Sequence, residues 1–218
     1  MRKILIIFIA ICAIFCTSSY SQNDVLKSET PEVPPSLTYL MQKSTVAIFS
    51  IGNKTGICTG VLIENSKDYS VTLTAKHCTG TFEEVYIDNE LSTYTSVSND
   101  DDLAIVVAPR IKNKVAVDLA RKQTNIGDKV YHLGYPSEGE LVSGGNIKRK
   151  SKDWQYGDYH TISGCSGGGV FNVNGELVGI NWGMIRWNLF TDKGLSILEP
   201  LSDVKRFLDM IKQPYTTR

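Results

Sequence analysis

Short apolar runs separated by polar turn residues follow one another from Ser44 to about residue 200. Runs of this length, bounded by Gly, Asn and Asp, are typical of β-strands. The Asn174-Gly175 pair, with Val173 before it and Leu177 soon after, is the strongest hairpin signal. The predicted strands are Thr45–Ser50, Gly56–Ile63, Ser70–Thr74, Glu83–Ile87, Leu103–Val107, Lys129–Leu133, Glu140–Asn146, Gly168–Asn172, Leu177–Asn181 and Leu195–Leu198.

Only the end of the chain has helical spacing. Val204, Leu208 and Ile211 recur at intervals that place them on one helix face, Phe207 lies beside them, and Ser202 can cap the first turn. The sequence therefore predicts an all-β fold, a barrel or a sandwich, with a C-terminal α-helix at about 202–212.

The N-terminus resembles a targeting segment rather than a folded element. Arg2 and Lys3 precede the apolar run Ile4–Phe15, and a small-x-small triplet ends at Ser21. This pattern predicts a secretory signal peptide at 1–21, cleaved after Ser21. The apolar run is shorter than the roughly 20 residues that a membrane span needs. An uncleaved anchor and a lipoprotein signal at Cys16 are the alternatives.

The residues after the signal are polar and contain Pro31, Pro34 and Pro35. Such a composition predicts a linker or a removed pro-segment at 22–39 rather than a packed element. We therefore expect the folded domain to comprise residues 40–212.

Charge and cysteine content narrow the function classes. The 218 residues include 23 Lys and Arg against 23 Asp and Glu. A nucleic-acid binder needs a basic face, so we expect no nucleic-acid partner. Loss of the signal peptide leaves Cys58, Cys78 and Cys165, and export brings these thiols into an oxidising compartment.

One glycine-rich segment, Gly164–Gly169, contains a serine at position 166. Glycines permit a sharp turn and let a substrate carbonyl approach main-chain N–H groups, here those of Gly164 and Ser166. A serine hydroxyl needs a base to act as a nucleophile, and a carboxylate must orient that base. His77 and Asp102 are the candidates. The order His, Asp, Ser excludes the α/β-hydrolases, in which the histidine follows the serine.

These segments resemble the motifs of the trypsin-like (chymotrypsin-fold) serine proteases. Thr74–Cys78 reads Thr-Ala-Lys-His-Cys and resembles the histidine box, Asp102–Ile105 resembles the aspartate box, and Gly164–Gly168 resembles Gly-Asp-Ser-Gly-Gly. Gly179–Gly183 is similar to the stretch that lines the specificity pocket. The resemblance covers about residues 40–212 and is to bacterial, HtrA-like protease domains without a PDZ domain.

The resemblance implies two six-stranded antiparallel β-barrels, at about 40–110 and 115–200, with the active site between them. Ser166 would attack the scissile carbonyl, His77 would transfer the proton, and Asp102 would orient the histidine. The main-chain N–H groups of the serine loop would form the oxyanion hole.

The resemblance also implies a disulfide between Cys58 and Cys78. The expected substrate-binding residues are His160, Thr161, Asn181, Trp182 and Gly183. The pocket floor has no acid, so cleavage after Lys or Arg is not expected. A histidine at 160 with a hydroxyl neighbour suggests an acidic substrate side chain, although a packed structural His160 fits equally well.

Cys165 departs from the family pattern, because the family usually has an aspartate there. The zymogen switch that depends on that aspartate cannot operate. Cys165 is also an alternative nucleophile, but Ser166 holds the position directly before Gly-Gly.

The expected function is thus that of an exported serine endopeptidase, secreted or periplasmic, that works through an acyl-enzyme. We expect a protein or peptide substrate, no cofactor, no metal, no stable membrane association after signal removal, and a monomer. A catalytically inactive binding module on the same fold and a cysteine hydrolase are the alternatives.

Overall fold

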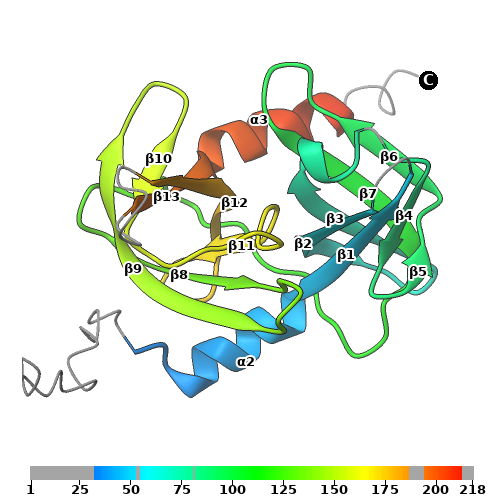
Figure 1. The fold of residues 1–218 in the computed structure, drawn as a ribbon, viewed down its shortest axis with the longest axis horizontal. Coiled ribbons are helices and arrows are strands. Elements are labelled where there is room, and N and C mark those ends of the chain that lie inside the picture. Colours follow the sequence, from blue (N-terminus) through cyan, green and yellow to red (C-terminus); the bar gives the residue numbers. More distant parts are fainter. Residues whose placement is uncertain (1–31, 53–54, 81, 187–193, 213–218) are drawn as a thin grey trace, which may run out of the picture.

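Two β-rich halves lie side by side in the computed structural model, which describes residues 32–52, 55–80, 82–186 and 194–212 (Figure 1). The predicted signal peptide at 1–21, and residues 22–31 of the predicted linker, lie outside these ranges.

The first half is an antiparallel sheet in the order β5-β4-β1-β2-β3-β7-β6. It differs from the expected closed six-stranded barrel, because the edge strands β5 and β6 do not pair. The turn between them joins the edges instead: Ser92 N–H donates to the carbonyl of Val85, and Thr93 N–H donates to that of Val107. The strands are β1 (Thr45–Ile51), β2 (Thr55–Asn65), β3 (Tyr69–Ala75), β4 (Glu84–Ile87), β5 (Glu90–Leu91), β6 (Tyr94–Val97) and β7 (Leu103–Pro109).

The second half is the expected closed barrel, in the order β10-β13-β12-β11-β8-β9. All its paired strands are antiparallel. The strands are β8 (Lys129–Gly134), β9 (Leu141–Lys150), β10 (Gln155–Gly157), β11 (Gly169–Phe171), β12 (Leu177–Arg186) and β13 (Gly194–Pro200). The fold is therefore chymotrypsin-like, as the sequence predicts.

A helix before β1 corrects the predicted linker at 22–39 over its last residues, 35–39. Helix α2 spans Pro35–Ser44, with Pro34 as its N-cap residue. A proline in the first turn is favourable, because its fixed φ suits a helix and its missing N–H has no helical partner. Leu37 and Met41 lie four residues apart and are buried, so this segment is part of the folded domain.

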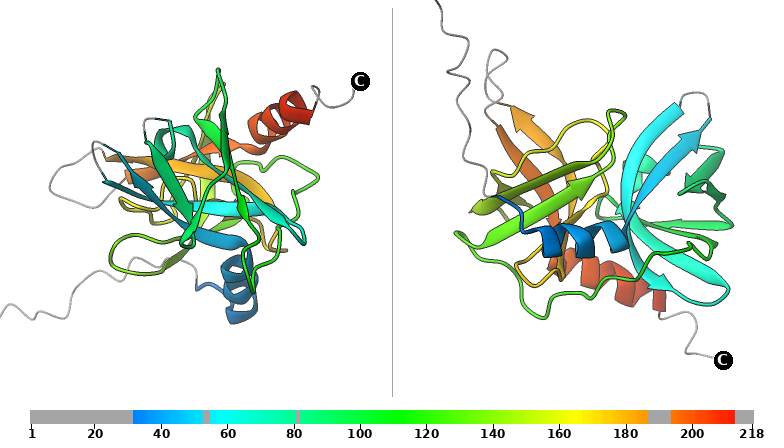
Figure 2. Two further views of the ribbon diagram at one scale, coloured as in Figure 1. Left: turned by 90° about the vertical axis from the view of Figure 1, so that its right-hand side faces the viewer. Right: turned by 90° about the horizontal axis from the view of Figure 1, so that it is seen from below.

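The largest apolar core lies between the two halves. It contains Val61, Leu73 and Leu103 from the first half with Leu133, Phe171 and Ile180 from the second. Helix α2 closes one side through Leu37 and Met41, and helix α3 (Leu201–Lys212) contributes Val204 and Phe207. Figure 2 shows both helices running past the junction of the halves. Each half also has a smaller core of its own.

Helix α3 confirms the predicted C-terminal helix. Among the residues that the structure describes, no helix has both the length and the apolar character needed to cross a membrane.

The buried face of α2 generates a stability prediction. Met41→Ala should lower the free energy of unfolding by about 2–5 kcal/mol, because Met41 is 0% exposed in the core between the halves. Leu40→Ala is the matched control. Leu40 is 52% exposed, so its loss should cost at most about 1 kcal/mol. Urea denaturation measures both, and equal losses would contradict the packing of α2.

Candidate active site

His77 and Asp102 form a pair at the end of the first half that faces the second. His77 lies in the 3₁₀ turn η1 (Lys76–Cys78), directly after β3. Its Nδ1 is 2.5 Å from Asp102 Oδ2, and its main-chain N–H donates to Asp102 Oδ1 at 2.9 Å. The Lys76 N–H donates to the Asp102 carbonyl at 3.1 Å. Both carboxylate oxygens of Asp102 are therefore engaged by one residue, which fixes the orientation of the imidazole.

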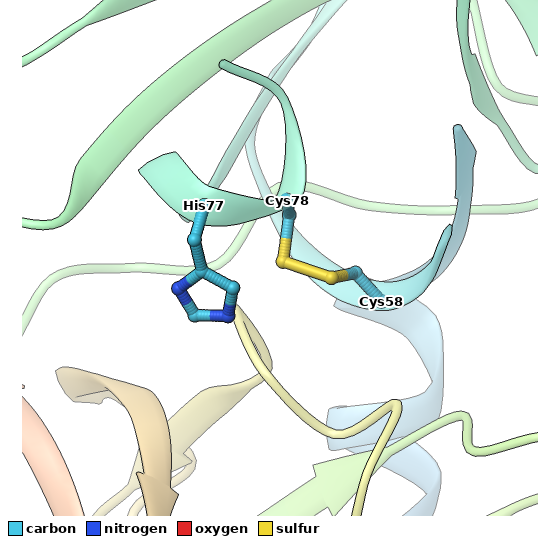
Figure 3. Close-up of side chains that lie close together, drawn as sticks. All are labelled: Cys58, His77 and Cys78. Carbon is cyan, nitrogen blue, oxygen red and sulfur yellow. A yellow bond between two sulfur atoms is a disulfide. The ribbon is translucent and has the colours of Figure 1, made fainter. Parts of the chain in front are cut away.

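A disulfide joins Cys58 on β2 to Cys78 beside His77, as the sequence predicts (Figure 3). Both cysteines are buried in the core of the first half. The bond ties the histidine turn to the neighbouring strand. The two sulfurs lie close to the His77 ring, but because they are bonded to each other they are not thiolate ligands for a metal.

Ser166 lies in a loop of consecutive tight turns. The Cys165 N–H donates to the Ile162 carbonyl at 3.1 Å, and Gly164 has φ +94°, which is the third position of a type II turn. Gly167 has φ +81°, and its N–H donates to the main-chain carbonyl of Asn181 on β12 at 2.7 Å. A side chain at Gly167 would collide with Thr74 and Thr59, so glycine is required there.

Thr59 on β2 holds the serine loop from the opposite half. Its N–H donates to the Ser166 carbonyl and its Oγ1 donates to the Gly164 carbonyl, both at 2.8 Å. Its Oγ1 in turn accepts the N–H of Tyr135 at 2.8 Å. Sequence reasoning missed this role, because only the fold brings the residue after Cys58 next to the serine loop.

The Ser166 hydroxyl donates to the carbonyl of Trp182 at 3.0 Å. The ring of Trp182 is 6.3 Å from the imidazole of His77, centroid to centroid. Trp182 therefore touches both candidate catalytic groups, although the described residues contain no hydrogen bond between His77 and Ser166 themselves. The N–H groups of Gly164 and Ser166 donate to no protein acceptor in the described part of the chain and stay available to an oxyanion.

Cys165 points away from this site into the second half. It is 0% exposed, and a side chain on Gly134 would collide with it. Burial raises the pKa of its thiol, with hydrogen bonds from Ile162 and Thr161 acting in the opposite direction. A buried, protonated thiol is a poor nucleophile.

The expected pocket residues fall into two groups. Thr161 and Asn181 are buried and bonded to each other: Asn181 Nδ2 donates to Thr161 Oγ1 at 3.0 Å. His160, Trp182 and Gly183 are exposed or half-buried. Trp182 packs edge-on against Trp154, with centroids 5.6 Å apart, and this pair forms an aromatic wall beside His77.

Glu199 on β13 is a further polar residue at the site that sequence reasoning missed. It is 2% exposed, and its Oε1 accepts the Asp102 N–H at 3.0 Å. Burial raises its pKa to about 7. The available signal was an acid at the end of the apolar run Leu195–Leu198, a position where an unpaired charge is costly.

Two surface hollows adjoin the candidate catalytic groups. One, of about 590 Å³, is lined by His77 and Asn99–Asp102. The other, of about 320 Å³, lies beside Gly164 and is lined by Phe49, Ile57 and Glu138 among others. The first hollow thus borders the His77–Asp102 pair, and the second borders the serine loop.

Comparison with protein families identifies one that matches this chain. The family model for the trypsin-like peptidase domain matches residues 58–180, which include all three candidate catalytic residues. No protein with a curated description matches the sequence.

Solved structures of proteases share the fold. A serine endoprotease from Yersinia pestis is 25% identical, with a TM-score of 0.66 over 82% of this chain and 67% of that one. The active form of the Rv3671c protease from M. tuberculosis is 22% identical, with a TM-score of 0.64 over 82% and 89% of the two chains. The HtrA-type protease AlgW, S227A with a tripeptide, is 19% identical, with a TM-score of 0.68 over 80% and 63%.

The disulfide generates a second stability prediction. The Cys58→Ala/Cys78→Ala double variant should lose about 3 kcal/mol, because the bond closes a loop with a sequence separation of 20 residues. Thermal unfolding with and without a reductant measures this loss. Reductant should lower the Tm of the parent protein and leave the double variant unchanged. A parent Tm that does not respond to reductant would contradict a stabilising disulfide.

Proposed function

The chain belongs to the trypsin-like peptidase family, and from that premise we propose that it is a serine endopeptidase. The observation that carries the proposal is the His77–Asp102 pair, held across the junction of the halves from a serine on a glycine-rich turn. The substrate is a protein or peptide bound along the hollows on either side of this centre.

In the proposed mechanism, Ser166 Oγ leaves the Trp182 carbonyl by rotation about χ1 and passes its proton to His77 Nε2 as it attacks the scissile carbonyl. His77 then protonates the leaving amine, which gives an acyl-enzyme. Water, deprotonated by His77, then attacks the acyl carbonyl, and His77 returns the proton to Ser166 Oγ as the acid product leaves. Asp102 accepts from His77 Nδ1 and stabilises the imidazolium that forms in each step.

The proposed oxyanion hole consists of the N–H groups of Gly164 and Ser166. Thr59 binds the carbonyls of the same two residues. These carbonyls lie one peptide group beyond the two N–H donors, so Thr59 holds the chain next to each donor residue and limits movement of the loop before substrate arrives. Donors that are fixed in advance stabilise developing charge without reorganising.

We further propose that the protein is exported. The disulfide beside His77 is of a kind that persists in oxidising compartments, and the sequence pattern at 1–21 has the form of a secretory signal. Secretion and a periplasmic location both satisfy this proposal.

The triad generates a kinetic prediction. Ser166→Ala and His77→Ala should each lower kcat on a cleavable peptide on the order of 10⁶-fold, and the double variant should be no slower than either. Groups that act as one unit lose their function together, so their effects do not add. Cleavage of a peptide library with a mass readout first identifies the substrate.

Ser92→Ala is the matched control, because Ser92 lies in the turn between β5 and β6 and lines neither hollow at the candidate centre, and its activity should equal that of the parent. Cys165→Ala tests the cysteine hydrolase, since a Cys165 nucleophile would make this variant inactive while Ser166→Ala stayed active. A folded parent protein that cleaves no peptide would instead favour an inactive binding module, consistent with the hydrogen bond from Ser166 to Trp182.

A further inference from the structure

A buried carboxylate links the second half of the protein to the main chain of Asp102. Glu199 lies on β13 of the closed barrel, whereas Asp102 precedes β7 in the other half, 97 residues away in sequence. The bond from Asp102 N–H to Glu199 Oε1 is 3.0 Å long, and Glu199 is 2% exposed. A hydrogen bond between an ionised acceptor and an N–H that is shielded from water is stronger than one at the surface.

This link differs from the other bonds that hold Asp102. Its carbonyl and both carboxylate oxygens accept from Lys76 and His77, which belong to the same half. Among the described residues, only the bond to Glu199 comes from the half that carries Ser166. It therefore ties the main chain of Asp102 directly to that half.

The charges around Glu199 are mostly negative. The loop before β7 contributes Asp101 and Asp102, and helix α3 contributes Asp203 and Arg206. Arg206 binds Asp101 at 2.7 Å and Asp203 at 2.9 Å, and no cation of the described residues forms an ion pair with Glu199.

Within the described ranges, the other elements next to Glu199 add no ion pair that balances its charge. The Lys76 ammonium turns to the Ser98 carbonyl at 2.8 Å. The residue opposite Glu199 on β12 is Ile180, which is apolar. The Asp102 N–H is therefore the hydrogen-bond donor that the described residues provide for this carboxylate.

We propose that Glu199 is a positioning residue, whose ionised carboxylate holds the Asp102 main chain and, through it, His77 in the arrangement that catalysis requires. This inference rests on the proposed serine peptidase function. Protonation of Glu199 would replace a charged acceptor by a neutral one and so weaken the link between the two halves at the active site.

The ionisation of Glu199 should affect activity and stability in opposite directions. Burial raises its pKa to about 7, with the nearby Asp101, Asp203 and Asp102 acting in the same direction and the bond from Asp102 N–H acting against it. The raised pKa means that this group's contribution to stability is present below pH 4.5 and is lost as the pH rises through about 7. As Glu199 ionises with the pH rising through about 7, its hydrogen bond with the Asp102 N–H becomes stronger.

Two variants test the role in peptide cleavage. Glu199→Gln keeps an oxygen acceptor without the ionisation. At pH 8 its kcat should be about threefold below that of the parent, which is the loss that protonation of Glu199 causes, and its acid limb should lack that step near pH 7. Glu199→Leu removes the acceptor, so kcat should fall about tenfold to a hundredfold with little change in KM. Glu90→Gln, an exposed acid on β5, is the control and should behave as the parent in both respects. Unchanged kcat in a folded Glu199→Leu variant, or equal losses in both Glu199 variants, would overturn the proposal.

A spectroscopic measurement tests the link without any cleavage. In ¹⁵N-labelled Ser166→Ala protein, the Asp102 amide resonance should titrate near pH 7, and the same resonance should stay flat in Ser166→Ala/Glu199→Gln. The low-field proton of His77 Nδ1 should shift in parallel. A flat Asp102 amide in the first protein would overturn the role of Glu199. A clear titration in a protein whose Ser166-containing form cleaves nothing would instead reject the proposed function alone.

Discussion

Apolar packing between the two halves is the interaction on which the candidate active site depends. His77 and Asp102 come from one side of this contact and Ser166 from the other. Leu73 and Leu103 pack with Leu133 and Ile180 in one continuous core. Because close-packed interiors allow little sliding, this contact fixes the separation of groups far apart in sequence. Helices α2 and α3 complete the same core, and Arg206 of α3 also binds Asp101 beside Asp102.

The apolar contact sets the separation of the candidate catalytic groups approximately, and hydrogen bonds between the halves make it more exact. Thr59 reaches from the first half to the carbonyls of the serine loop, and Glu199 reaches from the second half to the main chain of Asp102. Each half thus binds the segment of the other half that carries a candidate catalytic residue. The Cys58–Cys78 bond strengthens the same region, since Cys58 directly precedes Thr59 and Cys78 directly follows His77.

Much of the fold followed from local sequence patterns. Each predicted strand overlaps an observed one, because apolar runs bounded by turn residues are a local signal. Strands β5, β6 and β10 escaped prediction since their sequences, Glu-Leu, Tyr-Thr-Ser-Val and Gln-Tyr-Gly, contain no apolar run. Helix α2 was not predicted because Pro34 and Pro35 suggested a linker, although proline is also common at the first position of a helix.

The candidate site was predictable only in part. The histidine, aspartate and serine segments each carry a recognisable local motif, and the disulfide followed from the resemblance. Thr59 and Glu199 carry no such motif. Their partners are 105 and 97 residues away in sequence, so their roles appear only once the two halves are packed together. The hydroxyl of Ser166 was also unpredictable in direction, because its acceptor is a main-chain carbonyl of Trp182.

The most direct test of the central claim is covalent labelling of the folded protein with a fluorophosphonate, followed by peptide mapping. A nucleophile activated by His77 should give one adduct per chain on Ser166, and the His77→Ala variant should remain unlabelled. An unlabelled parent protein, or an adduct on Cys165 or another residue, would contradict the assignment of Ser166 as the nucleophile.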